Sequence, residues 1–207
     1  MKNRQTTVFI IAVVLTIAVI ASVFALALIG GAKAERDVPD YVDVQLISLL
    51  GAARSGRKLE AVRGIVVHYV GNPGTSAQAN RNYFANPSTV VCSHFVIGLE
   101  GEVIQCVPLD ERSAASNDRN RDTISIEVCH PDESGKFNES SYASLVKLTA
   151  WLCSEFDLTT DDVIRHHDVT GKMCPLYYVE HEDAWEAFRD DVALELELIS
   201  TESNERT

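Results

Sequence analysis

Alternating stretches of hydrophobic and polar residues predict strands interleaved with helices. Residues 64–70 (GIVVHYV) are a nearly continuous apolar run rich in β-branched residues, which is typical of a strand buried on both faces of a sheet. The turn-forming residues 71–74 (GNPG) end this strand. Residues 89–97 and 102–107 predict two strands joined as a hairpin, and residues 123–129 alternate as in a further strand.

Apolar residues at helical spacing predict helices between and after these strands. Ser76 is placed to cap a helix that extends to about Phe84. Residues 142–156 carry apolar side chains three or four positions apart, and the serine pair 140–141 lies near their start. Residues 182–198 predict a final amphipathic helix.

The order of these elements indicates the fold class. Residues 42–50 fit either a strand or a short helix, and Val163–Ile164 predict a short strand. Strands interleaved with helices favour an α/β domain with a central mixed β-sheet flanked by helices. We expect this domain to occupy residues 42–198, followed by a polar tail at residues 199–207.

The start of the chain has a different pattern. Residues 8–29 contain no charged residue, proline or glycine, and at about 1.5 Å per helical residue they would span roughly 33 Å. This pattern predicts a cytoplasmic N-terminus with a membrane-spanning signal anchor over residues 1–30 and a linker at 31–41. Because Lys2 and Arg4 precede the apolar segment, we expect the following domain to face outward from the cell membrane.

A cleaved signal peptide is the alternative for this segment. The small-residue triplet at 32–34 (AKA) resembles a cleavage site, and cleavage would give a secreted domain. The apolar stretch is longer than the 7–15 residues usual for a signal peptide, which favours the anchor.

Charge and cysteine content narrow the choice of partners. The formal net charge of −12 excludes a nucleic-acid partner, because phosphates require a basic surface. Five cysteines are an odd number for an exported chain, so at least one thiol is left for another role such as metal ligation. Cys92 and Cys106 could pair across the hairpin, although buried free thiols are the default expectation.

Candidate chemistry concentrates in residues 165–175 (RHHDVTGKMCP), where two histidines, an aspartate, a lysine and a cysteine lie close together. Imidazole and thiolate groups are preferred zinc ligands, and a catalytic zinc site uses three of them and leaves a fourth position open. His68, at the end of a buried strand, is a natural third ligand. A hydrogen-bonded core histidine and a structural four-ligand site are the alternatives.

Four motifs resemble those of a known family. The segments IVVHYVGNPGTSA, VVCSHFVIGLEGEVIQCVPL, NRDTISIEVCHP and IRHHDVTGKMCP occur in the order and spacing of the zinc-dependent N-acetylmuramoyl-L-alanine amidases. That family includes phage and prophage enzymes and shares its fold with peptidoglycan recognition proteins. The resemblance covers roughly residues 42–190. It implies Zn²⁺ as cofactor, peptidoglycan as substrate, and hydrolysis of the amide bond between N-acetylmuramic acid and L-alanine.

The resemblance also assigns roles to single residues. It implies that His68, His166 and Cys174 are the zinc ligands, because in the family motif a ligand histidine precedes the ligand cysteine by eight positions. Glu127 matches the catalytic glutamate, which acts as general base and then as general acid. Lys172 matches a lysine that stabilises the oxyanion.

Other residues near these motifs keep two interpretations. His167 is expected on the surface or on the substrate side, and His94 either contacts substrate or is a buried hydrogen-bonded residue. Asp168 either orients a ligand imidazole or caps the following turn. Ser93 stands where some relatives carry a tyrosine near the metal, so no tyrosine hydroxyl is expected at that position.

Three other functions compete with a zinc amidase. A non-catalytic peptidoglycan-binding module of the same fold would keep the groove without turnover. A thiol hydrolase would use Cys174 as nucleophile with a histidine base. A membrane-tethered structural or sensor protein would show neither metal binding nor turnover.

Overall fold

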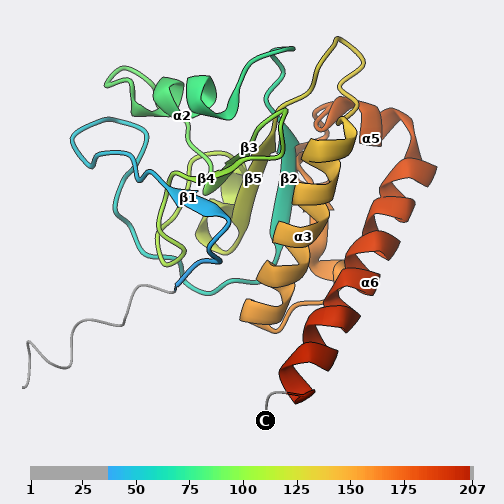
Figure 1. The fold of residues 1–207 in the computed structure, drawn as a ribbon. Helices are drawn as coiled ribbons and strands as arrows, with labels where there is room; N and C mark the ends of the chain where they lie inside the picture. Colours follow the sequence, from blue (N-terminus) through green and yellow to red (C-terminus); the bar gives the residue numbers. More distant parts are fainter. Residues whose placement is uncertain (1–36, 206–207) are drawn as a thin grey trace, which may run out of the picture. The chain divides into compact units, whose positions relative to one another are not determined.

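A twisted mixed β-sheet is the centre of the fold, and the computed structural model describes it within residues 37–205 (Figure 1). The sheet of the described region has the strand order β1-β4-β3-β5-β2-β6. Only β3 and β4 pair antiparallel, and the other neighbours pair in parallel. The bounds of the strands are β1 Val42–Val44, β2 Ile65–Tyr69, β3 Phe95–Ile97, β4 Val103–Gln105, β5 Ile124–Val128 and β6 Val163–Arg165.

Helices cover the two faces of the sheet unequally. The long helices α3 (Glu139–Phe156) and α6 (Glu182–Glu205) pack against one face, and α2 (Ala77–Ala85) packs against the other (Figure 1). Because side chains alternate along a strand, Ile65 and Val67 of β2 enter the core beneath α3 and α6, while His68 points to the opposite face. The structure therefore confirms the predicted central mixed sheet with flanking helices.

The helix starts follow the local capping chemistry. Ser76 caps α2 as predicted, since its side chain accepts a hydrogen bond from the Ala79 amide. Helix α3 begins earlier than expected, because Asn138 is its cap and accepts from the Ser141 amide at 2.9 Å. Helix α6 continues to Glu205, beyond its predicted end at Leu198.

The predicted membrane-spanning helix is the part of the fold prediction that is wrong. Within residues 37–205, no helix is both long enough and apolar enough to cross a membrane. Helix α6 has sufficient length, but acidic side chains recur along it, and burying them in lipid would be costly. The apolar segment 8–29 lies outside the described residues, so neither the anchor nor a membrane partner has support.

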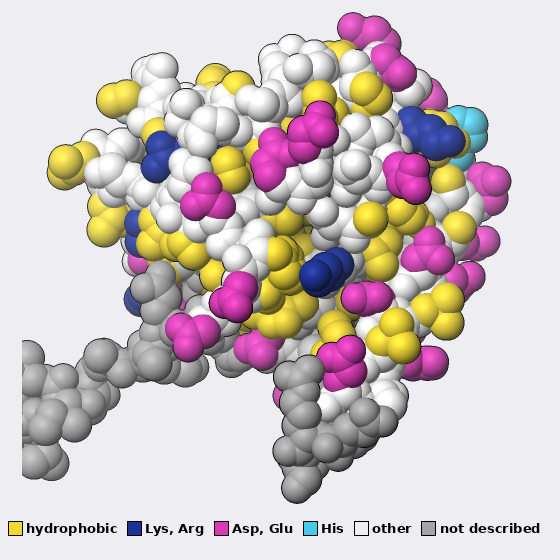
Figure 2. All heavy atoms as spheres, viewed as in Figure 1, with side chains coloured by type: hydrophobic (Ala, Val, Ile, Leu, Met, Phe, Trp, Pro, Cys, Tyr) yellow, Lys and Arg dark blue, Asp and Glu magenta, His cyan; other side chains and the backbone are white. Residues whose placement is uncertain are grey.

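Side chains on the surface reflect the acidic composition. Figure 2 shows Asp and Glu side chains spread over the viewed face of the molecule, with Lys and Arg in only a few places.

All five cysteines are buried and free, so the alternative Cys92–Cys106 disulfide is absent from the described region.

Candidate metal centre

Three elements bring the predicted ligands together. His68 lies near the end of β2, and His166 begins the short helix α4 (His166–Thr170) directly after β6. Since β2 and β6 are parallel neighbours, their carboxyl ends meet at one edge of the sheet. Cys174 returns to the same edge after the left-handed Gly171 ends α4. The three side chains are buried, and their ligand atoms lie within 4.8 Å of one another.

The loop before β5 fixes the orientation of both imidazoles. His68 Nε2 lies 3.1 Å from the Ser116 hydroxyl, and His166 Nε2 lies 3.1 Å from the Asn117 side-chain oxygen. The other ring nitrogen of His68, Nδ1, lies 3.9 Å from Cys174 Sγ. Asn117 holds a left-handed backbone conformation with φ 53°, which non-glycine residues rarely adopt.

Burial sets the protonation states of these groups. The pKa of His68 is held well below its usual value by burial, and His166 and Lys172 lower it further. Burial followed by Lys172 lowers the pKa of His166. Burial raises the pKa of the Cys174 thiol to about 12, with a smaller contribution from Glu127. Neutral imidazoles are the form that ligates metal, whereas a thiol nucleophile acting alone would need a lowered pKa.

Glu127 lies opposite the ligand cluster. It pairs with His68 in the register of β2 and β5, so both side chains leave the same face of the sheet. Glu127 Oε1 lies 4.0 Å from His68 Nδ1, while Oε2 is buried and forms no hydrogen bond. Burial raises the pKa of Glu127 to about 8. A carboxyl group in this state is suited to exchanging a proton near neutral pH.

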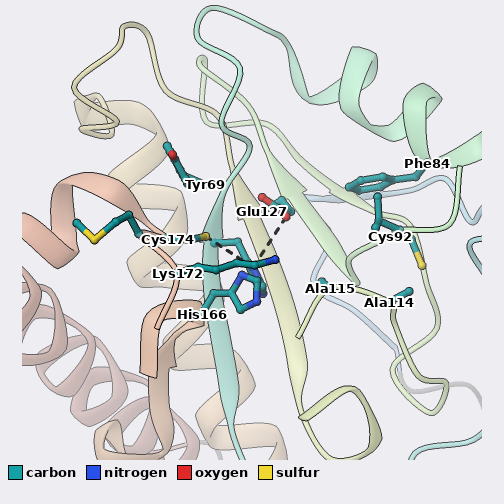
Figure 3. Close-up of a pocket in the computed structure, with 12 residues that line it drawn as sticks. Tyr69, Phe84, Cys92, Ala114, Ala115, Glu127, His166, Lys172 and Cys174 are labelled. Atoms are coloured by element: carbon teal, nitrogen blue, oxygen red, sulfur yellow. Dashed lines mark hydrogen bonds and ion pairs between the residues drawn. The ribbon is translucent and has the colours of Figure 1, made fainter. Parts of the chain in front are cut away.

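A cleft of about 380 Å³ opens over these residues (Figure 3). Figure 3 shows the exposed Lys172 side chain extending over His166 toward the space in front of Glu127. The other side chains around the cleft are mainly apolar. The lining residues are His68, Tyr69, Phe84, Val91, Cys92, Ala114, Ala115, Glu127, His166, Lys172, Met173 and Cys174.

The donor set fits a tetrahedral metal with one open position. Zinc–nitrogen and zinc–sulfur bonds near 2.0 and 2.3 Å place tetrahedral N and S ligands roughly 3.6 Å apart. The 3.9 Å between His68 Nδ1 and Cys174 Sγ is close to that separation. The cluster therefore offers three protein ligands at the floor of an open cleft, with an unpartnered carboxylate oxygen beside them.

Comparison with known proteins identifies the family. A family model described as N-acetylmuramoyl-L-alanine amidase matches residues 58–176, more than half of the chain. The chain belongs to the N-acetylmuramoyl-L-alanine amidase family. This confirms the resemblance that the four sequence motifs carry.

Individual members of the amidase family support the assignment. CwlL of Bacillus licheniformis is 30% identical over 156 residues, which cover 67% of this chain and 43% of CwlL. BlyA of Bacillus subtilis (strain 168) is 29% identical over 160 residues with the same two coverages. The chain thus spans less than half the length of these curated relatives. The solved catalytic domain of XlyA has a TM-score of 0.64 at 26% identity, covering 73% of this chain and 98% of that domain.

Within the amidase fold, the structure separates the neighbouring histidines. His166 belongs to the ligand cluster, as the spacing to Cys174 predicts. His167 points away from it, and its Nδ1 lies 2.9 Å from the Lys172 carbonyl. His94 is fully buried, bonded to Ser125 and to the Glu111 carbonyl, so it is a hydrogen-bonded core residue and does not line the cleft.

Asp168 and Ser93 also have structural roles. Asp168 accepts hydrogen bonds from the Arg165 amide and guanidinium, which caps α4 and orients no ligand imidazole. The buried Ser93 donates a hydrogen bond to the Phe95 carbonyl and does not line the cleft. Its neighbour Cys92 does line the cleft.

No pattern in the sequence predicts the contacts of Ser116 and Asn117 with the ligand imidazoles. Both residues lie in a polar loop that carries no periodic pattern, so only the folded chain shows that they hold the ligand imidazoles.

Proposed function

We propose that this chain hydrolyses the amide bond between N-acetylmuramic acid and L-alanine in peptidoglycan, with Zn²⁺ held by His68, His166 and Cys174. The observation that carries the proposal is the position of Glu127 beside these ligands at the floor of an open cleft. A peptidoglycan-binding module would not need a carboxylate oxygen that is buried without a hydrogen-bond partner beside a ligand set. The sequence relationship to amidases gives independent support.

The residues around the cleft would each contribute to a different part of amide hydrolysis. Zinc bound here would polarise the scissile carbonyl and lower the pKa of the attacking water. Glu127 is placed to take a proton from the attacking water and to deliver it to the departing amino group of L-alanine. Lys172 places a positive charge where the carbonyl oxygen becomes negative. Ser116 and Asn117 keep the ligand imidazoles oriented throughout.

Metal content and turnover together test this proposal. The full chain is loaded with Zn²⁺, zinc is measured by elemental analysis, and new L-alanine amino groups released from purified peptidoglycan are counted. The variants are Glu127→Gln and His68→Ala. Their matched controls are Glu186→Gln and His181→Ala, which change the same residue types at exposed positions.

The outcomes separate the candidate functions. We expect one zinc per wild-type chain, and Glu127→Gln should keep the zinc but lose roughly 10²–10⁴-fold in turnover. His68→Ala should lose both, and the two controls should behave as wild type. Zinc without turnover in the wild type would support the peptidoglycan-binding module. Turnover that survives His68→Ala and chelation would exclude the zinc mechanism.

A further inference from the structure

A second cavity lies beside the candidate metal centre and has the opposite chemical character. Its volume is about 450 Å³, and its walls are polar. Three arginines contribute to it in a chain whose formal net charge is −12. We call it the arginine pocket, and its lining residues are Ser55, Arg57, Arg112, Ser113, Asn117, Asp118, Asn120 and Arg121.

The arginine pocket carries unneutralised positive charge. Arg112 is held in place by the Glu60 carboxylate at 2.8 Å and the Lys58 carbonyl at 3.0 Å. Among the side chains of residues 37–202, none forms a hydrogen bond or ion pair with the exposed guanidinium groups of Arg57 and Arg121. Asp118 is the single acidic residue in the wall. Planar guanidinium groups bind carboxylate and phosphate oxygens with paired hydrogen bonds.

A single chain segment separates the arginine pocket from the metal-site cleft. Ala114 and Ala115 line the cleft, while Ser113 and Asn117 on either side of them line the pocket. Asn117 also contacts His166 directly, with its side-chain oxygen 3.1 Å from Nε2. A substrate that extends over this segment would therefore contact both cavities.

We propose that the arginine pocket binds an anionic group of the same wall polymer whose amide bond lies in the cleft. This inference rests on the proposed amidase function and specifies its substrate. Peptide stems carry carboxylates, and muramic acid residues can carry phosphate. Both offer the oxygens that Arg57 and Arg121 can bind. On a strongly acidic protein, this pocket would offset the repulsion of an anionic polymer.

Binding to zinc-free protein tests the proposal without turnover. Calorimetry measures the Kd of three soluble probes for the full chain: a muramyl pentapeptide with free carboxylates, the same compound with every carboxylate amidated, and the amidated compound with a 6-phosphate on the sugar. The variant is Arg57→Gln/Arg121→Gln. The control is Arg63→Gln, an exposed arginine on a neighbouring loop that does not line the pocket.

We expect the wild type to bind at least one anionic probe roughly tenfold or more tightly than the amidated neutral probe. The double variant should lose that difference, and Arg63→Gln should keep it. If the double variant loses affinity for the carboxylate probe, the anionic group belongs to the peptide. If it loses affinity for the phosphate probe, the anionic group belongs to the glycan. Equal affinity for all three probes, no measurable binding of any probe by the wild type, or the same loss in Arg63→Gln would overturn the proposal.

This test is independent of the amidase test. If zinc-loaded wild type shows turnover but the double variant binds every probe like wild type, only the anion subsite is wrong. If the pocket discriminates the probes and turnover is absent, the amidase proposal fails while the subsite remains as part of a binding module.

Discussion

At the scale of single residues, the candidate site depends on side chains that the loop before β5 holds in place. Ser116 and Asn117 touch one imidazole nitrogen each, which leaves the other nitrogen of His68 directed at Cys174. Such contacts select the tautomer and fix the ring before any metal binds.

Removing one of these contacts should weaken metal binding without removing a ligand. We expect Ser116→Ala to lower zinc affinity by roughly 10–100-fold, because the His68 ring would lose its orientation. Competition with a chromophoric chelator measures the affinity. Ser134→Ala, at an exposed serine in another loop, is the control and should leave the affinity unchanged. Equal zinc affinity for Ser116→Ala and wild type would show that the hydroxyl does not orient the ring.

The buried His94 should make folding sensitive to acid. Burial lowers the pKa of His94 from 6.5 to about 4, so the unfolded chain binds a proton more readily than the folded chain between these values. The neutral, buried imidazole therefore makes its full contribution to stability above pH 6.5. The free energy of unfolding falls by about 3 kcal/mol as the pH drops to 4. Denaturant unfolding across this pH range measures the change, with NMR titration of the imidazole as a second reading. A His94 resonance that titrates near pH 6.5 in the folded protein would contradict this account.

At the scale of elements, capping shows where local sequence and structure diverge. Asn138 caps α3 and also donates to the Leu99 carbonyl, which ties the helix to the hairpin. The serine pair 140–141 was the more obvious signal in the sequence, yet it lies inside the helix. A register shift of two residues cannot be read from capping preferences alone, since Asn and Ser cap about equally well.

The cap assignment predicts unequal effects of two similar substitutions. Asn138→Ala should destabilise the fold by about 1–2 kcal/mol, because it removes the bonds to the Ser141 amide and the Leu99 carbonyl. Ser140→Ala, at an exposed position in the first turn that is not the cap residue, should change stability by less than about 0.5 kcal/mol. Thermal or urea unfolding compares them. If the Ser140 substitution were the more costly, α3 would begin later than the structure has it.

At the scale of the whole molecule, the metal centre joins distant parts of the chain. His68 lies on β2, and Cys174 lies 106 positions later in the loop that follows α4. A metal that binds only the folded chain stabilises it by mass action, by about 2.7 kcal/mol at a hundredfold excess over Kd.

Chelation should therefore lower stability and activity together. We expect removal of zinc to reduce the Tm of the full chain and abolish release of L-alanine amino groups, and added Zn²⁺ should restore both. Differential scanning calorimetry and the peptidoglycan assay report the two effects, and mock dialysis without chelator is the control. Turnover that persists after chelation but is blocked by alkylating Cys174 would favour the thiol hydrolase instead.

The sequence by itself determined the order and type of the main strands and helices, since periodicity and capping act over a few neighbouring residues. It also determined the family, because the four motifs and the spacing between them can be recognised along the linear sequence. Its inference of a membrane helix from apolar length found no support in the described residues.

Only the tertiary structure decided how these pieces form a site. Strand register places Glu127 opposite His68, and a pattern-free loop brings Ser116 and Asn117 to the imidazoles. The same loop places Arg112 and Arg121 in the wall of a second cavity. Such contacts join residues far apart in the chain, and their geometry depends on packing that no local window of sequence contains.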